Sequence, residues 1–134
     1  MTTRIEKSEA EWKAQLSEEQ FSICRKKGTE RAFSGVLWDQ HAAGIYHCVC
    51  CAAPLFASGD KFDSGTGWPS YVRPVNDTAI AYHEDRSLFS KRTEAVCAAC
   101  DAHLGHVFDD GPAPGGKRYC INSASLSFKA EDET

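Results

Sequence analysis

The stretch Cys48-Val49-Cys50-Cys51 contains two cysteines, Cys48 and Cys51, separated by two residues, and Cys97-Ala98-Ala99-Cys100 repeats this spacing. A turn of this length aims both thiolates at one ion, and two such turns supply the four ligands of a closed tetrahedral Zn²⁺ site. Because protein would fill all four positions, the predicted zinc is structural rather than catalytic. Residues 52–96 separate the pairs, so the metal is expected to join two hairpins that are distant in the sequence.

Buried free thiols and a redox-active pair are the alternative interpretations of these cysteines. A redox CxxC motif usually occurs once, beside a strand–helix–strand pattern, and this chain shows neither feature. Cys50 forms no further CxxC with Cys97 or Cys100, and we interpret it as a spectator that packs outward from the turn.

The composition predicts one globular domain in a reducing compartment. The chain has 134 residues, of which 42% are hydrophobic and 25% charged, as expected for a single folded domain. Its seven cysteines, an odd number, argue against a disulfide framework. The formal net charge of −4 argues against nucleic-acid binding. The chain also lacks a run of about 20 apolar residues and an apolar signal-peptide core, so we expect a cytoplasmic protein that does not contact a membrane.

Short segments with frequent turns predict a mainly β domain behind a helical arm. Capping boxes that begin at Ser8 and Ser17 predict helices over 8–15 and 17–26. Apolar and β-branched runs predict strands at 45–49, 79–82, 88–89, 94–97, 106–108 and 118–128. The single domain, 1–134, is accordingly divided into a helical arm (1–28), a β core (29–128) and a frayed tail (129–134).

The longest predicted strand, 118–128, carries a candidate nucleophile. Because side chains alternate along a strand, Cys120 lies on the same face as Arg118 and Asn122. A guanidinium beside a thiol favours the thiolate and lowers the thiol pKa. The pattern therefore indicates an activated cysteine, although a small buried core cysteine fits the same spacing.

Two further motifs offer an acid and an apolar wall. His103 and His106 follow the second cysteine pair, and carboxylates come after them at 109–110. Imidazoles titrate near neutral pH, so this pair is predicted to supply a general acid. Trp68 stands in the glycine-rich loop 64–70, where it is predicted to form a wall of an apolar pocket. The alternatives are a satisfied polar contact for each histidine and a core position for the indole.

Together these motifs resemble the methionine sulfoxide reductase B family, the peptide-methionine (R)-S-oxide reductases. The resemblance covers most of residues 20–128 and rests on both cysteine pairs and on 25–30, 64–70, 103–112 and 118–126. It implies a zinc-stapled, sandwich-like tent of two antiparallel sheets with short N-terminal helices, and a zinc away from the active site. It also implies a substrate, the R epimer at sulfur of methionine sulfoxide, mostly within oxidised proteins.

The resemblance also implies roles for individual residues. Cys120 matches the nucleophile of the family, and Arg118 matches the arginine beside it. Trp68 matches the residue that packs on the sulfoxide methyl, and Phe108 joins it as a substrate-binding residue. The residues that match those assisting proton transfer and positioning the thiolate and the sulfoxide oxygen are His103, His106 and Asn122.

The chain departs from the family in the glycine-rich loop. Many members carry a resolving cysteine where this chain has Thr66. Cys24 is then the candidate resolving cysteine, and it must be mobile if it is to reach Cys120. The implied cycle is a Cys120 sulfenic acid, then a disulfide, then reduction by thioredoxin.

Two other classes of protein are alternatives. A zinc-ribbon binding module needs the four cysteines but has no need of the motif at 118–126. A zinc hydrolase or deaminase needs an open coordination position, which a four-cysteine shell does not leave. A deaminase also needs a His-x-Glu sequence before its cysteines, and His83-Glu84 lacks that spacing.

Overall fold

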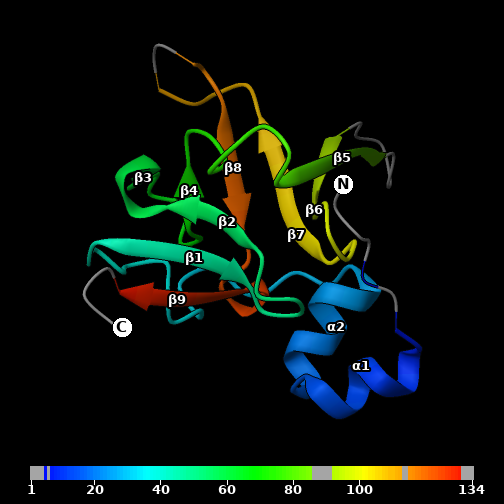
Figure 1. Cartoon of the computed structure of the whole chain (residues 1–134). Helices are drawn as coiled ribbons and strands as arrows, with labels where there is room; N and C mark the ends of the chain where they lie inside the picture. Colours follow the sequence, from blue (N-terminus) through cyan, green and yellow to red (C-terminus); the bar gives the residue numbers. More distant parts are fainter. Residues whose placement is uncertain (1–4, 6, 86–91, 113–114, 131–134) are drawn as a thin grey trace.

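The computed structural model describes residues 5, 7–85, 92–112 and 115–130. Two antiparallel sheets form its body, and helices α1 (Glu9–Gln15) and α2 (Glu18–Lys26) pack at one end of them (Figure 1). The strand order is β2-β1-β9 in the smaller sheet and β3-β4-β8-β7-β6-β5 in the larger one. The expected mainly β fold with short N-terminal helices is thereby confirmed.

The strands of the smaller sheet are β1 (Gly44–Cys48), β2 (Pro54–Ala57) and β9 (Leu126–Ala130). Those of the larger sheet are β3 (Lys61–Phe62), β4 (Ser70–Tyr71), β5 (Ile80–Asp85), β6 (Arg92–Cys97), β7 (His103–Phe108) and β8 (Arg118–Ile121). Two 3₁₀ turns, η1 (Ser58–Asp60) and η2 (Ser123–Ser125), lie between strands.

The predicted capping boxes start both helices. The Ser8 hydroxyl accepts from the Glu11 amide, and the Glu11 carboxylate accepts from the Ser8 amide. Ser17 and Gln20 exchange the same two hydrogen bonds at the start of α2. Since each box satisfies amides that a helix start leaves unpaired, the caps fix where the helices begin. Lys27, the C-cap residue that follows α2, adopts a left-handed conformation with φ of 59°.

Aromatic side chains join the two sheets. Phe56 of β2 stacks on Tyr71 of β4 with ring centroids 4.3 Å apart, and Tyr46 of β1 meets the same ring edge-on at 5.3 Å. All three side chains are fully buried. The helices add Trp12 and Phe21 to this core, as their helical spacing predicts.

The strand predicted over 118–128 is two strands in different sheets. β8 ends at Ile121, η2 turns the chain, and β9 begins in the smaller sheet. The apolar positions change phase across the turn, from Tyr119 and Ile121 to Leu126 and Phe128, so one continuous strand does not fit both halves. The break is held at Asn122, whose carbonyl oxygen accepts from the Ser125 amide inside the turn.

Other boundaries also differ from the prediction. Lys129 and Ala130, expected in a frayed tail, pair with Ile45 and Gly44 in the smaller sheet. The strands β2, β3 and β4 were not predicted, since each has only two to four residues. The strand expected at 88–89 lies outside the described residues. No helix in the described part of the chain combines the length and apolar character needed to cross a bilayer.

Candidate active site and metal centre

A bulge in β7 brings the two predicted histidines to one face of the larger sheet. Ala95 of β6 pairs with Gly105, whereas the next residue, Val96, pairs with His103, so Leu104 is an extra residue in β7. Residues three apart in a regular strand point to opposite faces, and one extra residue reverses this. The rings of His103 and His106 are accordingly neighbours, with centroids 5.5 Å apart.

Cys120 lies opposite His106 across the β7–β8 pair. Directly opposed residues of antiparallel strands project to the same face with Cβ atoms about 4.5–5.5 Å apart. A side chain at Gly105 would meet the carbonyl oxygen of Cys120, so only glycine fits where β7 passes this point.

A pocket of about 120 Å³ opens at Cys120. It is lined by Thr29, Trp68, Arg92, Gly105, His106, Phe108, Cys120, Ile121 and Asn122. Five of the predicted site residues thus converge on one hollow. His103 is buried behind it, and Arg118 lies beside Cys120 on the same strand.

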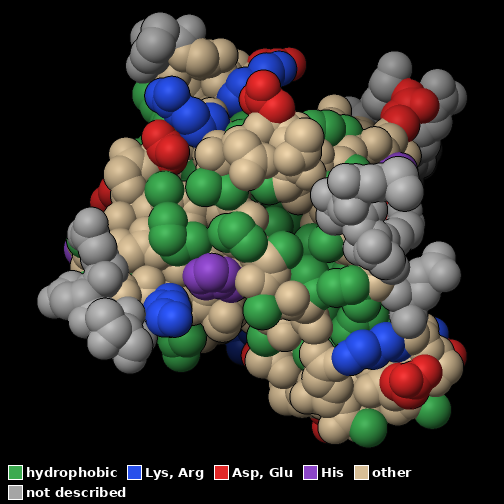
Figure 2. Space-filling model, viewed as in Figure 1, with side chains coloured by type: hydrophobic (Ala, Val, Ile, Leu, Met, Phe, Trp, Pro, Cys, Tyr) green, Lys and Arg blue, Asp and Glu red, His purple; other side chains and the backbone are tan. Residues whose placement is uncertain are grey.

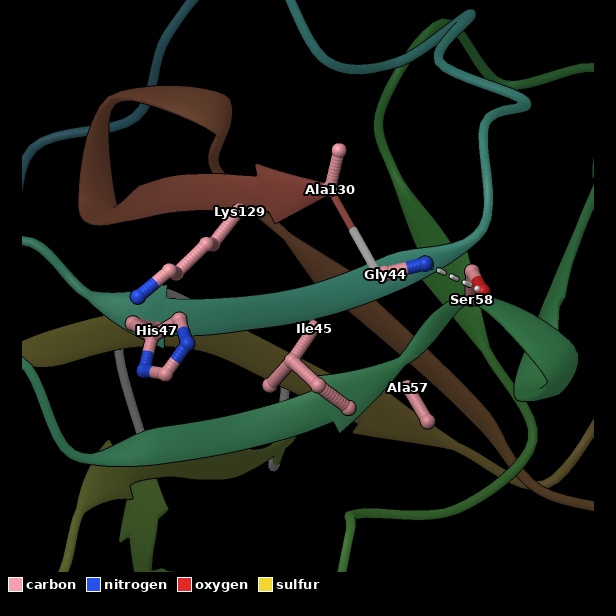
Figure 3. Close-up of a pocket in the computed structure, with 7 residues that line it drawn as sticks. All are labelled: Gly44, Ile45, His47, Ala57, Ser58, Lys129 and Ala130. Carbon is pink, nitrogen blue, oxygen red and sulfur yellow. Dashed lines mark hydrogen bonds between the residues drawn. The ribbon is translucent and has the colours of Figure 1, made fainter. Parts of the chain in front are cut away.

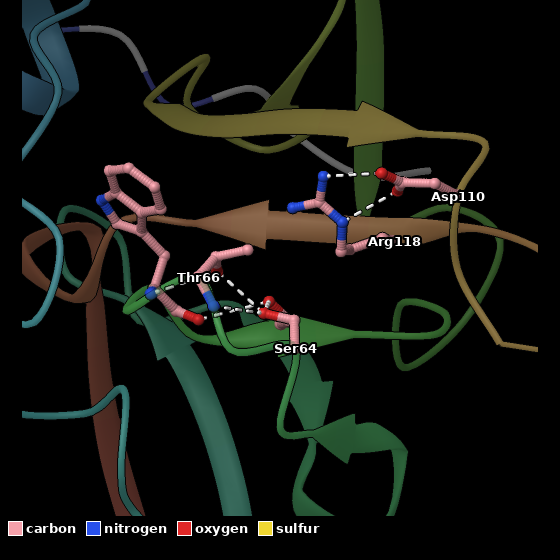
Figure 4. Close-up of polar contacts among 6 residues, drawn as sticks. Ser64, Thr66, Asp110 and Arg118 are labelled. Atoms are coloured by element: carbon pink, nitrogen blue, oxygen red, sulfur yellow. Dashed lines mark hydrogen bonds and ion pairs between the residues drawn. The ribbon is translucent and has the colours of Figure 1, made fainter.

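Arg118 is braced from two sides. Its Nε and a terminal nitrogen donate to the Asp110 carboxylate at 2.8 and 3.1 Å (Figure 4). Its guanidinium carbon lies 4.4 Å from the centroid of the Phe108 ring. Acidic and basic side chains cluster over this β7–β8 hairpin at the top of the molecule (Figure 2). These contacts fix the positively charged guanidinium of Arg118, which lies two residues before Cys120 in the sequence.

Burial raises the pKa of the Cys120 thiol above its ordinary value of 9.0. The charge of Arg118 and its hydrogen bond act in the opposite direction, as expected from the sequence, but burial outweighs them. The expectation that Cys120 has a lowered pKa is therefore wrong for the resting protein. Burial thus favours the thiol form of Cys120 over the thiolate.

Hydrogen bonds within the glycine-rich loop and from the indole ring hold Trp68 in position. The Ser64 hydroxyl lies 2.7 Å from the Thr66 hydroxyl (Figure 4). It also lies 2.8 Å from the Ser70 hydroxyl. Gly65 and Gly67 adopt φ of 75° and 86°, which glycine tolerates at no steric cost. The indole Nε1 donates to the carbonyl oxygen of Glu30 at 3.0 Å.

Asn122 is locked by its surroundings. Its Oδ1 accepts from the Glu30 amide at 3.0 Å, and its Nδ2 donates to the carbonyl oxygen of Leu104 at 3.0 Å. Since the backbone of Glu30 also holds Trp68, this one residue ties together two walls of the pocket. Sequence reasoning missed Glu30, whose buried carboxylate accepts from the Ala124 amide.

Sequence reasoning also missed Glu94, the partner of His103. The Nδ1 atom of His103 lies 2.6 Å from Oε2 of Glu94, and both side chains are at most 4% exposed. Burial lowers the pKa of His103, and the nearby Glu94 carboxylate opposes this effect. The only sign of this role in the sequence was the position of Glu94, an acidic residue beside apolar Ala95 and Val96 in a predicted strand.

Cys24 lies away from the Cys120 pocket. It is 2% exposed on α2, and its Sγ is 3.6 Å from the Ser125 hydroxyl. A hydrogen bond with Cys50 is the main cause that lowers the pKa of Cys24. The prediction that Cys50 packs outward is wrong, because Cys50 is 5% exposed and lies in the hydrophobic core. The described geometry does not bring Cys24 and Cys120 together.

The four predicted metal ligands do come together. Their Sγ atoms all lie within 4.8 Å of one another, and the separations are 3.7 Å for Cys48–Cys100 and 3.6 Å for Cys51–Cys97. A tetrahedron with zinc–sulfur bonds of about 2.3 Å has edges of about 3.8 Å. The cluster therefore fits a metal ion of this kind, with ligands from the end of β1 and from the β6–β7 turn.

Comparison with known proteins places this geometry in a family. The family model described as the SelR domain matches residues 16–130. The chain is 56% identical over 132 residues to the peptide methionine sulfoxide reductase MsrB of Thiobacillus denitrificans, covering 98% of this chain and 100% of that one. The chain belongs to the MsrB family.

Plant members of the MsrB family are similar over part of their length. The chain is 59% identical over 122 residues to the chloroplastic peptide methionine sulfoxide reductase B1 of rice, covering 91% of this chain. It is 56% identical over 127 residues to the chloroplastic B1 protein of Arabidopsis thaliana, covering 95% of this chain. It spans 57% and 63% of these two relatives, respectively.

Thr66, at the position where the resemblance implies a resolving cysteine in many relatives, has a structural role. Its hydroxyl contacts that of Ser64 and accepts from the Trp68 amide at 3.4 Å. It also shares a shallow surface hollow with Asp110 and Arg118. This loop thus supplies no thiol near Cys120, and any resolving thiol must come from elsewhere.

A larger hollow, of about 410 Å³, lies on the smaller sheet (Figure 3). It is lined by Gly44, Ile45, His47, Ala57, Ser58, Lys129 and Ala130. Its hydrogen bond from the Gly44 amide to the Ser58 hydroxyl joins β1 to the start of η1. None of the predicted site residues lines it, so size alone does not identify the active site.

Alkylation of Cys120 tests the balance between burial and charge. Because the pKa of this thiol is raised, its rate of reaction with iodoacetamide should keep rising with pH to 9.0 and beyond. Arg118→Gln removes a contribution that lowers this pKa, so alkylation at mildly alkaline pH should slow several-fold. Arg73→Gln, which changes an exposed arginine, is the matched control. A plateau near neutral pH, or faster alkylation of the Arg118 variant, contradicts this assignment. Peptide mass spectrometry measures both rates.

Proposed function

We propose that this protein reduces methionine (R)-sulfoxide in oxidised proteins to methionine, with Cys120 as the nucleophile. The observation that carries the proposal is the pocket in which Cys120, His106 and Trp68 converge. Membership of the MsrB family and the names of its relatives support the same reaction. A binding module would need no such convergence beside the cysteine cluster.

The first chemical step transfers oxygen to Cys120. The Cys120 sulfur attacks the sulfoxide sulfur, and the thiol proton ends on the sulfoxide oxygen. The sulfur–oxygen bond of the substrate breaks as one forms on Cys120, giving a sulfenic acid and methionine. Cys120 is oxidised by two electrons and the substrate sulfur is reduced by two, so the step balances without another reactant.

His106 is the proton carrier in this step. It lies opposite Cys120 across the strand pair and lines the same pocket, so it faces both the thiol and the bound sulfoxide. A protonated imidazole donates to the oxygen as it leaves the substrate sulfur. His103, packed against His106, acts in support.

The walls of the pocket provide a basis for choosing one epimer. Trp68 and Phe108 form apolar surface suited to the methyl group of the substrate. Asn122 and His106 present polar groups suited to the sulfoxide oxygen. Since the two epimers exchange the positions of the oxygen and the lone pair at sulfur, only one of them satisfies both walls.

Cys24 is the proposed resolving thiol. It condenses with the Cys120 sulfenic acid to form a disulfide and water, and a dithiol reductant of the thioredoxin type then restores both thiols. A disulfide needs Cα atoms about 4.4–6.8 Å apart, so part of α2 or of the segment after β8 has to move. The contact of Cys24 with Ser125 already places α2 against that segment.

The four-cysteine cluster is proposed to hold a structural Zn²⁺. The sulfur–sulfur separations support this role. Four thiolates also complete a tetrahedral coordination shell and leave no position open for water or substrate. When bound, the ion supplies a cross-link between β1 and the β6–β7 turn. Arg25 of α2 donates to the carbonyl oxygen of Cys100 at 2.8 Å and stabilises that turn.

The nucleophile is tested with stereochemically pure substrates. Wild-type protein with a thioredoxin system should reduce the R epimer of a methionine sulfoxide peptide and leave the S epimer untouched. Cys120→Ser should lower R-epimer turnover by at least about 1,000-fold, since a hydroxyl is a far weaker nucleophile than a thiol. An unchanged melting temperature of the variant serves as the folding control. Retained turnover in Cys120→Ser excludes this nucleophile.

The resolving thiol is tested by a single turnover without reductant. One equivalent of R sulfoxide should convert wild-type protein to a species with a Cys24–Cys120 disulfide, identified by peptide mass spectrometry. Cys24→Ser should complete the same turnover and stop at a sulfenic acid that dimedone traps. A sulfenic acid that persists in the wild type would show that Cys24 is a bystander.

The metal is tested by elemental analysis. The purified protein should contain one zinc per chain, and Cys97→Ser should lose it. Structural zinc contributes on the order of 10 kcal/mol in zinc-finger peptides, so we expect the melting temperature to fall by more than about 10 °C. A Cys97→Ser protein that lacks zinc and melts like the wild type contradicts the structural role.

A further inference from the structure

A row of polar residues crosses the larger sheet at the level of the nucleophile. Glu94 of β6 is the register partner of His106 in β7, and His106 is the register partner of Cys120 in β8. Directly opposed residues share a face of the sheet, so these three side chains stand side by side. Figure 1 shows the three strands running next to one another. Glu94 therefore belongs to the surroundings of the active site although it does not line the pocket.

The carboxylate of Glu94 is buried and is paired on both oxygens. Its side chain is 2% exposed. Oε2 lies 2.6 Å from Nδ1 of His103, and Oε1 lies 3.3 Å from Nζ of Lys27, the C-cap residue that follows α2. Burying a carboxylate is costly unless charged or hydrogen-bonding partners compensate it. An apolar residue would fill this strand position at lower cost, so the pairing itself requires an explanation.

The contact with Glu94 determines which nitrogen of His103 carries the proton. A carboxylate paired with an ammonium group only accepts hydrogen bonds, so Nδ1 of His103 must be the donor. Burial lowers the pKa of His103 and keeps the ring neutral, which leaves Nε2 as an acceptor. Nε2 is buried and has no hydrogen-bond partner among the described residues. The ring that carries it packs nearly perpendicular to His106.

We propose that Glu94 is a positioning residue, which holds the proton of His103 on Nδ1 and so presents Nε2 as an acceptor beside His106. An acceptor at this place can orient the neighbouring ring of His106, whose centroid lies 5.5 Å from that of the His103 ring. Glu94 thereby prepares His106 to deliver a proton to the sulfoxide oxygen. Lys27 pairs with the other oxygen of the Glu94 carboxylate, and His83 of β5 is in register with Glu94 on its other side. This inference rests on the proposed role of His106.

The tautomer of His103 can be measured in the wild-type protein without any substrate. Nitrogen-15 NMR of histidine-labelled protein distinguishes a ring protonated at Nδ1 from one protonated at Nε2, and His103→Gln assigns the signals by loss. We expect the His103 ring to be protonated at Nδ1. A ring protonated at Nε2 overturns the proposal. This measurement does not depend on catalysis, so it stands if the protein reduces no sulfoxide at all.

The consequence for the reaction is tested with Glu94→Gln, which keeps the shape of the side chain and removes its charge. We expect kcat for the R epimer to fall about 10- to 100-fold, as is typical when the partner that orients a histidine is lost, with KM changed less than about twofold. In the same variant, the His103 signals should shift toward a mixture of tautomers. Glu18→Gln, at an exposed position in the first turn of α2, is the matched control and should keep wild-type kcat.

The outcomes separate this proposal from the reductase function. If Glu94→Gln keeps wild-type kcat, or raises KM with kcat unchanged, Glu94 has no positioning role. If Glu94→Gln does not fold, the tautomer of the wild-type protein still decides the matter. Failure of the wild-type protein to turn over either epimer would overturn the proposed function and leave the NMR result valid.

Discussion

The bulge at Leu104 is the constraint on which the active site depends. It rotates His103 onto the face that holds His106 and Cys120, which a regular strand would not do. The Leu104 carbonyl also accepts from both the amide and the side chain of Asn122. Because Asn122 stands where β8 ends, one extra residue in β7 both assembles the histidine pair and fixes the point at which the chain leaves the larger sheet.

Burial and charge act against each other at Cys120, and burial prevails. A permanently ionised thiol in an open pocket would react with any oxidant, since oxidation follows thiolate character and exposure. The half-buried thiol of Cys120, with its raised pKa, is less reactive than such a thiolate. Under the proposed function, the sulfoxide oxygen would be the group that receives the proton when the thiol reacts.

The sequence predicted the parts of the protein whose causes are local. Capping boxes specify their own helix starts, and two CxxC turns specify four converging sulfurs whatever separates them. The bulge, the break after Ile121 and the partner of His103 were not predicted. The bulge and the partner of His103 arise from pairing between strands that are distant in the sequence, and alternation along one strand carries no information about its neighbour's register. The break was marked only by a change in the phase of the apolar positions.

If Cys24 is the resolving thiol, as proposed, the burial of the helical arm limits how it can reach Cys120. The apolar side chains that anchor α1 and α2 to the body include Trp12, Leu16, Phe21 and Ile23. At about 2 kcal/mol for each buried side chain, detaching the whole arm costs on the order of 8 kcal/mol. This is comparable to the entire stability of a typical domain. Cys24 precedes the last residues of α2, so unwinding the final turn alone would free it while the four-cysteine cluster keeps the β body intact.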